Sequence, residues 1–225
     1  MVLIFDLDDT LYDESSFVKS GLRAVAKYGE LSFGWDANNS FDFMNNHLRV
    51  HGRGKIFDEW LRNNNHYSTG KVNTCIKVYR HHKPDISLYS SASNIIEKYY
   101  KKMSMYLVTD GHKIVQSNKI IALNLEPFFK RTFITHRFGI KNAKPSLHCF
   151  EIIRLSERCQ WSDIVYVGDN PAKDFVNLNK VGALTVRVHT GFYCFDRASA
   201  GYDAAFKIPD LDLLPSLLHQ RKNSA

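Results

Sequence analysis

The chain has 225 residues, and 30 lysines and arginines against 23 aspartates and glutamates give it a formal charge of +7 and a pI near 9.2. Hydrophobic residues make up 44% of the sequence and aromatic residues 13%, so the chain can bury a real core, which excludes a disordered polyelectrolyte and a disulfide-held miniprotein. The basic residues are scattered along the chain, and we therefore expect attraction for small anions and no nucleic-acid partner.

The sequence predicts neither a membrane segment nor a disulfide framework. No apolar run approaches the roughly 18 residues that span a bilayer, and the chain opens directly on a strand-like run, so we expect no signal peptide, no membrane partner and a cytoplasmic location. The cysteines show no CxxC spacing, which predicts buried free thiols and no structural zinc. They are Cys75, Cys149, Cys159 and Cys194.

Short apolar runs alternate with amphipathic stretches, a pattern typical of a parallel sheet with helical crossovers. We expect residues 219–225, which are polar, to form a flexible tail. The predicted strands are Val2–Phe5, Met105–Val108, Arg131–Ile134, Ile164–Val167 and Ala183–Val188. The helices predicted between them are Ser93–Lys102, His112–Leu123, Leu147–Leu155 and Pro171–Val181, the last with a proline in its first turn, where proline is tolerated.

Residues 15–85 interrupt this alternation just after the first strand. They hold 11 lysines and arginines against 6 aspartates and glutamates, and half of the ten histidines. We predict that they form a helical domain inserted into an α/β core made of residues 1–14 and 86–218. The predicted helices are Ser15–Tyr28, Phe41–Val50, Ile56–Asn63 and Lys71–His81, separated at Gly29, Gly34, the 51–54 stretch and Gly70.

Three acidic residues, Asp6, Asp8 and Asp9, follow the first strand directly. Open α/β sheets place their sites at the carboxyl ends of strands. Asp6 and Asp8 would point the same way along an extended strand, and their like charges would repel. A divalent cation, a shared proton or a reaction offsets such repulsion. We interpret Asp9 as a turn residue without a chemical role.

Three later segments carry related chemistry. Thr109, followed by Asp110 and a glycine, ends the second strand and can offer a hydroxyl and backbone N–H groups to a phosphate. Lys144 precedes a proline, which fixes the turn that holds this cation. Asp169 and Asp174 form a second acidic pair after another strand.

In this order the motifs resemble those of the haloacid dehalogenase superfamily, in its phosphatases with a helical cap inserted after the first motif. The resemblance covers nearly the whole chain and implies a Rossmann-like core, with a parallel sheet flanked by helices, and an all-α cap. The DxDxT motif is met by Asp6, Asp8 and Thr10, the later motifs by Thr109, by Lys144, and by Gly168, Asp169 and Asp174.

The resemblance implies a Mg²⁺-dependent phosphomonoester hydrolase that acts through an aspartyl-phosphate on a small phosphorylated metabolite, such as a sugar phosphate or a nucleoside monophosphate. Asp6 would be the nucleophile, and Asp8 the acid that protonates the leaving oxygen and then activates water. We expect a monomer or a homodimer. The remaining implied roles are phosphoryl binding by Thr109 and Lys144, Mg²⁺ binding by Asp6, the Asp8 carbonyl and Asp169, placement of Lys144 or a metal-bound water by Asp174, and support by Thr10 and Asp110.

Other activities compete with this interpretation. Dehalogenases of the superfamily lack a carboxylate two residues after the nucleophile, and Asp8 argues against them. A phosphomutase of the β-phosphoglucomutase type would keep all the motifs and stays open. A receiver-like phosphoacceptor module also combines acids, a threonine and Lys-Pro around Mg²⁺, but its two acidic elements lie on different strands.

Arg53 is a possible substrate contact in the inserted domain. Glycines flank it in the turn between two predicted helices, so the backbone there can turn the guanidinium away from its own helices. An exposed turn with an incidental arginine is the competing interpretation.

Overall fold

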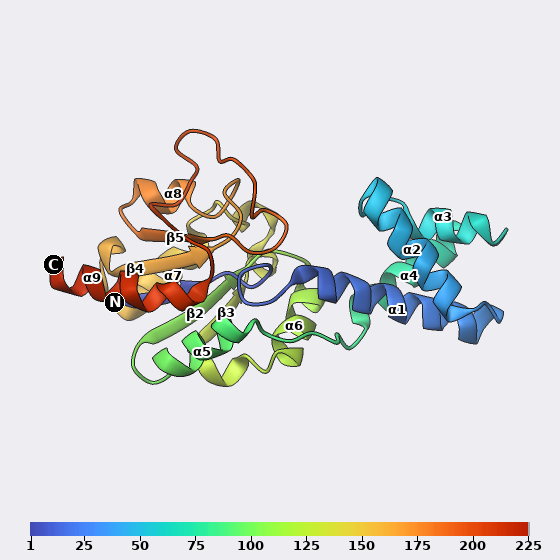
Figure 1. The fold of residues 1–225 in the computed structure, drawn as a ribbon, viewed down its shortest axis with the longest axis horizontal. Helices are drawn as coiled ribbons and strands as arrows, with labels where there is room; N and C mark the ends of the chain where they lie inside the picture. The colour runs from blue at the N-terminus through green and yellow to red at the C-terminus, as the bar shows by residue number, and fades with distance from the viewer. Residues whose placement is uncertain (225) are drawn as a thin grey trace. The chain divides into compact units, whose positions relative to one another are not determined.

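A computed structural model of the protein describes residues 1–224 and divides into two compact units (Figure 1). The sheet unit comprises Met1–Glu14 and the chain from Ser87 on, and the helical unit comprises Ser15–Ile86. No helix within residues 1–224 combines the length and the apolar character that crossing a membrane requires.

The sheet unit is built on six parallel strands in the order β3-β2-β1-β4-β5-β6. β1 therefore lies between β2 and β4, so connections leave it in both directions and the carboxyl ends of these three strands meet at one edge, where such sheets place their sites. The strands are β1 Val2–Phe5, β2 Ser104–Thr109, β3 Arg131–Ile134, β4 Ile164–Gly168, β5 Leu184–Val188 and β6 Phe206–Ile208.

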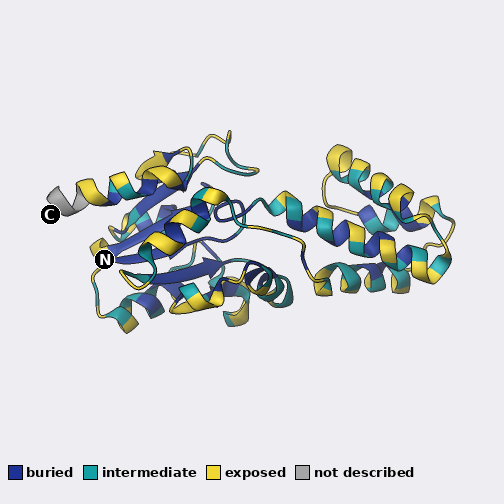
Figure 2. Cartoon of the chain, turned by 60° about the horizontal axis from the view of Figure 1, so that its bottom comes forward, coloured by how far each residue is buried: buried dark blue, intermediate teal, exposed yellow. Residues whose placement is uncertain are grey.

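Both faces of the central strand are covered (Figure 2). Val2 and Ile4 pack in a cluster with Phe150 of helix α7, His148–Glu157, whereas Leu3 and Phe5 alternate to the opposite face, and all four strand residues are buried. Burial on both faces explains the continuous apolar run VLIF. Each such side chain stabilises the fold by roughly 1.5–3 kcal/mol.

The helices around the sheet depart from the sequence predictions by three residues or more at three places, one of them being α5, which runs over Ser90–Tyr99 where Ser93–Lys102 was predicted. The helix predicted from Pro171 begins only at Val176, because Asn170 starts a turn in which Asp174 N donates to Asn170 O at 3.0 Å. The predicted tail is instead part of a helix that runs to Ser224, and Ala225 lies outside the described residues. The helices are α5 Ser90–Tyr99, α6 Lys113–Ala122, α7 His148–Glu157, α8 Val176–Lys180 and α9 Leu214–Ser224, with 3₁₀ turns at Glu126–Phe128, Thr135–Phe138, Ile140–Asn142, Trp161–Asp163 and Leu211–Leu213.

The helical unit packs around Trp60, which is fully buried. Gly29 does not end the first helix as predicted, because a Cβ there would lie 2.7 Å from the Trp60 ring, so this glycine permits a close helix contact. The helix ends at Phe33, before Gly34 at φ +72°. Gly70, predicted to separate two helices, is instead the second residue of the helix Thr69–His81. The helices are α1 Glu14–Phe33, α2 Ala37–His51, α3 Ile56–Asn63 and α4 Thr69–His81.

All four cysteines are free thiols. Cys75 and Cys149 are buried as predicted, whereas Cys159 and Cys194 are only partly buried.

Asp9 ties the loop after β1 to the loop after β5. Its carboxylate accepts from Glu14 N at 2.9 Å and from Phe192 N at 3.0 Å, and its carbonyl accepts from the Thr190 hydroxyl. Gly191, at φ +66°, lies directly against the Asp9 side chain. The turn residue predicted at position 9 therefore also anchors a distant loop.

We predict that Gly191→Ala is far more destabilising than Gly201→Ala. Both glycines have positive φ, but a Cβ at Gly191 would overlap Asp9 whereas none would meet an atom within 4 Å at Gly201. We expect a loss of about 1 kcal/mol for Gly201→Ala and about 3 kcal/mol for Gly191→Ala, measured by denaturant unfolding. Equal losses would show that the contact with Asp9 contributes nothing.

Candidate active site

The end of β1 separates Asp6 from Asp8. Asp6 N still donates to Val167 O of β4 at 2.9 Å, so Asp6 continues the sheet. A turn then begins, in which Leu11 N donates to Leu7 O at 3.0 Å. The Asp6 and Asp8 side chains would point the same way only along an extended strand, and the strand does not stay extended through position 8.

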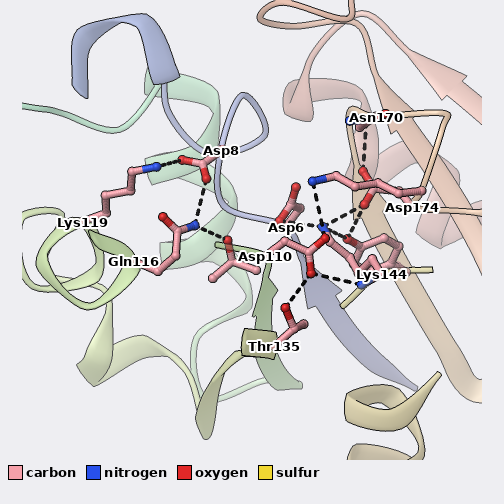
Figure 3. Close-up of polar contacts among 12 residues, drawn as sticks. Asp6, Asp8, Asp110, Gln116, Lys119, Thr135, Lys144, Asn170 and Asp174 are labelled. Carbon is pink, nitrogen blue, oxygen red and sulfur yellow. Dashed lines mark hydrogen bonds and ion pairs between the residues drawn. The ribbon is translucent and has the colours of Figure 1, made fainter. Parts of the chain in front are cut away.

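A buried ammonium group joins the ends of β1 and β4. Lys144 Nζ lies 2.9 Å from Asp6 Oδ1, 2.8 Å from Asp174 Oδ1 and 3.0 Å from Tyr166 Oη (Figure 3). All four residues are buried. The Tyr166 hydroxyl accepts from Lys144 and donates to Asp174 Oδ1 at 3.1 Å, so the three partners fix the position of the charge.

The loop that carries Lys144 is held from the end of β2. Asp110 Oδ1 accepts from Lys144 N at 3.1 Å and from the Thr135 hydroxyl at 2.6 Å. Lys173 Nζ lies 3.5 Å from the other Asp110 oxygen. Asp110 therefore sets the backbone of Lys144, while Asp6 and Asp174 set its side chain.

Burial controls the protonation of this cluster. Burial, only partly offset by Lys144, raises the pKa of Asp6 to about 7. Burial and the charge of Asp174 raise the pKa of Asp169 to about 9. Burial would lower the pKa of Lys144, but Asp174 and Asp6 hold it well above its usual range. Lys144 is therefore positively charged, and two of the carboxyls favour protons.

The carboxylates of Asp6, Asp169 and Asp174 fit a hard divalent cation. Each offers an oxygen, and the three oxygens lie within 4.8 Å of one another. Asp6 Oδ1 is buried and accepts no hydrogen bond from any described residue, since its contact with Lys144 lacks hydrogen-bond geometry. Asp174 is more committed, because its Oδ2 also accepts from Asn170 N at 2.9 Å. Asp6 and Asp169 are thus the more available ligands.

Asp8 lies in a second charged group (Figure 3). Its carboxylate contacts Lys119 Nζ at 2.6 Å, Tyr12 Oη at 2.6 Å and Gln116 Nε2 at 2.8 Å. Burial alone would raise the pKa of Asp8, but the charge of Lys119 and the hydrogen bonds from Lys119, Tyr12 and Gln116 together outweigh it and hold the pKa below its usual range. The Asp8 side chain is not part of the carboxylate cluster that fits a cation.

The other sequence-predicted residues are distributed as follows. The Thr109 hydroxyl, at the end of β2, lies 2.6 Å from Gln116 Nε2. Thr10 is buried, and its hydroxyl has no hydrogen-bond partner in the described part of the chain. Arg53 belongs to the helical unit, where it is exposed in the turn between α2 and α3.

Sequence reasoning missed Tyr166, Gln116, Lys119 and Lys173 as neighbours of the site. Tyr166 could have been noticed as a residue with a polar hydroxyl inside the apolar strand sequence VYVG. Gln116 and Lys119 are spaced i, i+3 on the helix that follows Thr109, which places them on one face. This spacing was the available signal.

Comparisons with known proteins establish the family. The family model described as haloacid dehalogenase-like hydrolase matches residues 3–188. The chain is 30% identical over 199 residues to glyceraldehyde 3-phosphate phosphatase of Methanocaldococcus jannaschii, covering 85% of this chain and 86% of that one. It is 25% identical over 233 residues to the enzyme of the same name from Pyrococcus furiosus, covering 99% and 95%.

Solved structures agree on the fold. The HAD-hydrolase YfnB of Bacillus subtilis, bound to magnesium, matches with a TM-score of 0.68 at 18% identity over 96% of this chain and 97% of that one. A 2-haloacid dehalogenase from Pseudomonas syringae matches with a TM-score of 0.66 at 17% identity, over 98% of each chain. The chain belongs to the haloacid dehalogenase-like hydrolases. It is an enzyme of their phosphatase branch, which sets the receiver-like module aside.

We predict that Asp169 lowers the folding stability of the metal-free protein as pH rises. The folded-state pKa of about 9 lies above the ordinary value of 3.8, so the stability that proton binding contributes is complete below pH 4 and is lost as pH rises toward 9. Asp169→Asn should therefore gain stability relative to wild type between pH 5 and pH 9, measured by urea unfolding in a chelator. A difference between the two proteins that stays constant with pH would contradict this prediction, and Asp42→Asn, at an exposed position of α2, is the control.

Proposed function

We propose that the chain hydrolyses a small phosphomonoester of the sugar-phosphate class through an aspartyl-phosphate at Asp6. The observation that carries this proposal is the Lys144 ammonium, held 2.9 Å from Asp6 at the carboxyl end of β1. A phosphate dianion is repelled by a carboxylate nucleophile unless positive charge lies beside both. Lys144 supplies such a charge, and its anchors at Asp174 and Tyr166 keep it there.

The first step transfers the phosphoryl group. Asp6 attacks phosphorus, the bond from phosphorus to the ester oxygen breaks, and that oxygen takes a proton from Asp8. Lys144 and the Thr109 hydroxyl hold the phosphoryl oxygens. In the second step Asp8 takes a proton from water as the water oxygen attacks phosphorus, the bond to Asp6 breaks, and phosphate leaves. Asp6 and Asp8 then have their starting protonation.

Mg²⁺ is the proposed cofactor, held by the carboxylates of Asp6 and Asp169 and by the carbonyl of Asp8. When bound, it would supply further positive charge against the phosphate. Asp174 is proposed to hold Lys144, in keeping with their 2.8 Å contact. Thr10 and Asp110 are proposed to support the loops that carry Asp8 and Lys144.

The curated relatives suggest the first substrate to test, because two of them are named for glyceraldehyde 3-phosphate. The decisive experiment is a phosphate-release assay with Mg²⁺ on a panel of sugar phosphates, short phosphorylated acids and nucleoside monophosphates. Release of phosphate supports a hydrolase. Isomerised phosphoester without phosphate release would support a phosphomutase instead.

We predict that Asp6→Asn abolishes phosphate release while the protein stays folded. The amide cannot attack phosphorus, and the exchange removes one of three crowded carboxylates, so stability should not fall. We expect a loss on the order of 10³-fold or more in kcat, with circular dichroism and melting temperature near wild type. Asp42→Asn is the matched control. Retention of a tenth of the activity would reject Asp6 as nucleophile.

We propose that Arg53 recognises the part of the substrate remote from the phosphoryl group. The turn is exposed, and Gly52 at φ +75° ends α2 just before it. Arg53→Ala should lower kcat/KM for the preferred metabolite by roughly ten- to a hundredfold, or about 1.4–2.8 kcal/mol. Hydrolysis of a small aryl phosphate should hardly change. Equal losses on both substrates would contradict a role in recognition.

A further inference from the structure

Three donors converge on the carboxylate of Asp8, and Figure 3 shows Lys119 and Gln116 among them. Oδ1 accepts from Lys119 Nζ and from Tyr12 Oη, each at 2.6 Å, whereas Oδ2 accepts, among the described residues, from Gln116 Nε2 alone, at 2.8 Å. A carboxylate has about four lone-pair positions. Oδ1 is therefore filled by two donors, and Oδ2 keeps a position for one more partner.

Burial of the Lys119 ammonium group costs free energy of folding. Lys119 is only 2% exposed, and burying an ammonium is unfavourable unless it is paired. Its partners include Asp8 and, at 3.5 Å, Glu14. An apolar pair of similar volume would stabilise such a position as well or better. Stability alone therefore does not account for a buried lysine against Asp8.

Gln116 links Asp8 to the end of β2. Its Nε2 lies 2.8 Å from Asp8 Oδ2 and 2.6 Å from the Thr109 hydroxyl. Gly111 leaves room for this arrangement, because a Cβ there would lie 3.2 Å from Gln116 Cδ. One buried amide group thus sets the separation between Asp8 and Thr109.

We propose that Lys119 and Gln116 are positioning residues that fix the Asp8 carboxylate for proton transfer. Lys119 holds Oδ1, and this leaves Oδ2 as the oxygen that carries the proton. Gln116 keeps Oδ2 beside Thr109, where the phosphoryl group binds. The inference rests on the proposed function, since it assigns Asp8 the proton transfers described there.

The test compares two leaving groups in the first turnover. An alkyl phosphate needs its leaving oxygen protonated, whereas 4-nitrophenolate leaves readily without a proton, so a misplaced acid slows the first substrate more. Rapid-quench measurement of leaving-group release would be made with Mg²⁺ for wild type, Lys119→Met and Gln116→Leu. Lys113→Met, an exposed lysine on the same helix, is the matched control.

We expect each positioning variant to lower the ratio of alkyl to aryl release rate by about tenfold or more, part of the roughly 10²–10⁴ that acid–base catalysis contributes. KM and the control ratio should stay near wild type. If Lys119→Met does not fold, the ratio of alkyl to aryl release rate measured for Gln116→Leu tests the proposal.

Two results would overturn the inference, and they are distinguishable. Suppose that the wild type is active and that the folded variants release both leaving groups more slowly by the same factor, or at the wild-type rate. This result rejects the positioning role and leaves the proposed function standing. A wild type that releases neither leaving group rejects the proposed function and this inference with it.

Discussion

The charge balance of this site depends on one buried ammonium group, that of Lys144. Lys144 lies among three carboxylates at the ends of β1 and β4, those of Asp6, Asp169 and Asp174, and only Asp6 and Asp174 touch it. If all three were ionised, two negative charges would stay uncompensated in a buried place. Protons relieve this charge in the free protein, and a divalent cation can relieve it when bound. The raised pKa values of Asp6 and Asp169 and the proposed binding of a cation both follow from that imbalance.

The turn at Leu7 divides the acids between two environments. Asp6 lies with Lys144, and burial raises its pKa to about 7, whereas Asp8 lies with Lys119, which holds its pKa below the usual range. Two carboxyls of one short motif thus differ in proton affinity. In the metal-free protein Asp6 is thus the more easily protonated of the two, and a divalent cation bound beside it would favour its ionised form.

The sequence predicted those parts of the structure that depend on local pattern. The bounds of β1 and α3 are as predicted, because a continuous apolar run and a short amphipathic helix need no distant partner to be recognised. Gly29 was misjudged because its role is a contact with Trp60, thirty-one positions away. β6 is three residues long and has no pattern of its own. Two partners of Asp8, Gln116 and Lys119, lie more than a hundred residues along the chain, so only the fold brings them to it.

The central claim is that Asp6 carries the phosphoryl group between the two steps. The most direct measurement is to mix enzyme and substrate with Mg²⁺, quench in acid within the first turnover, reduce with borohydride and read the peptide containing Asp6 by tandem mass spectrometry. Reduction of an aspartyl-phosphate yields homoserine. The account predicts homoserine at position 6 and at no other aspartate. Turnover without it, or with the label at Asp8 or Asp169, would contradict the account.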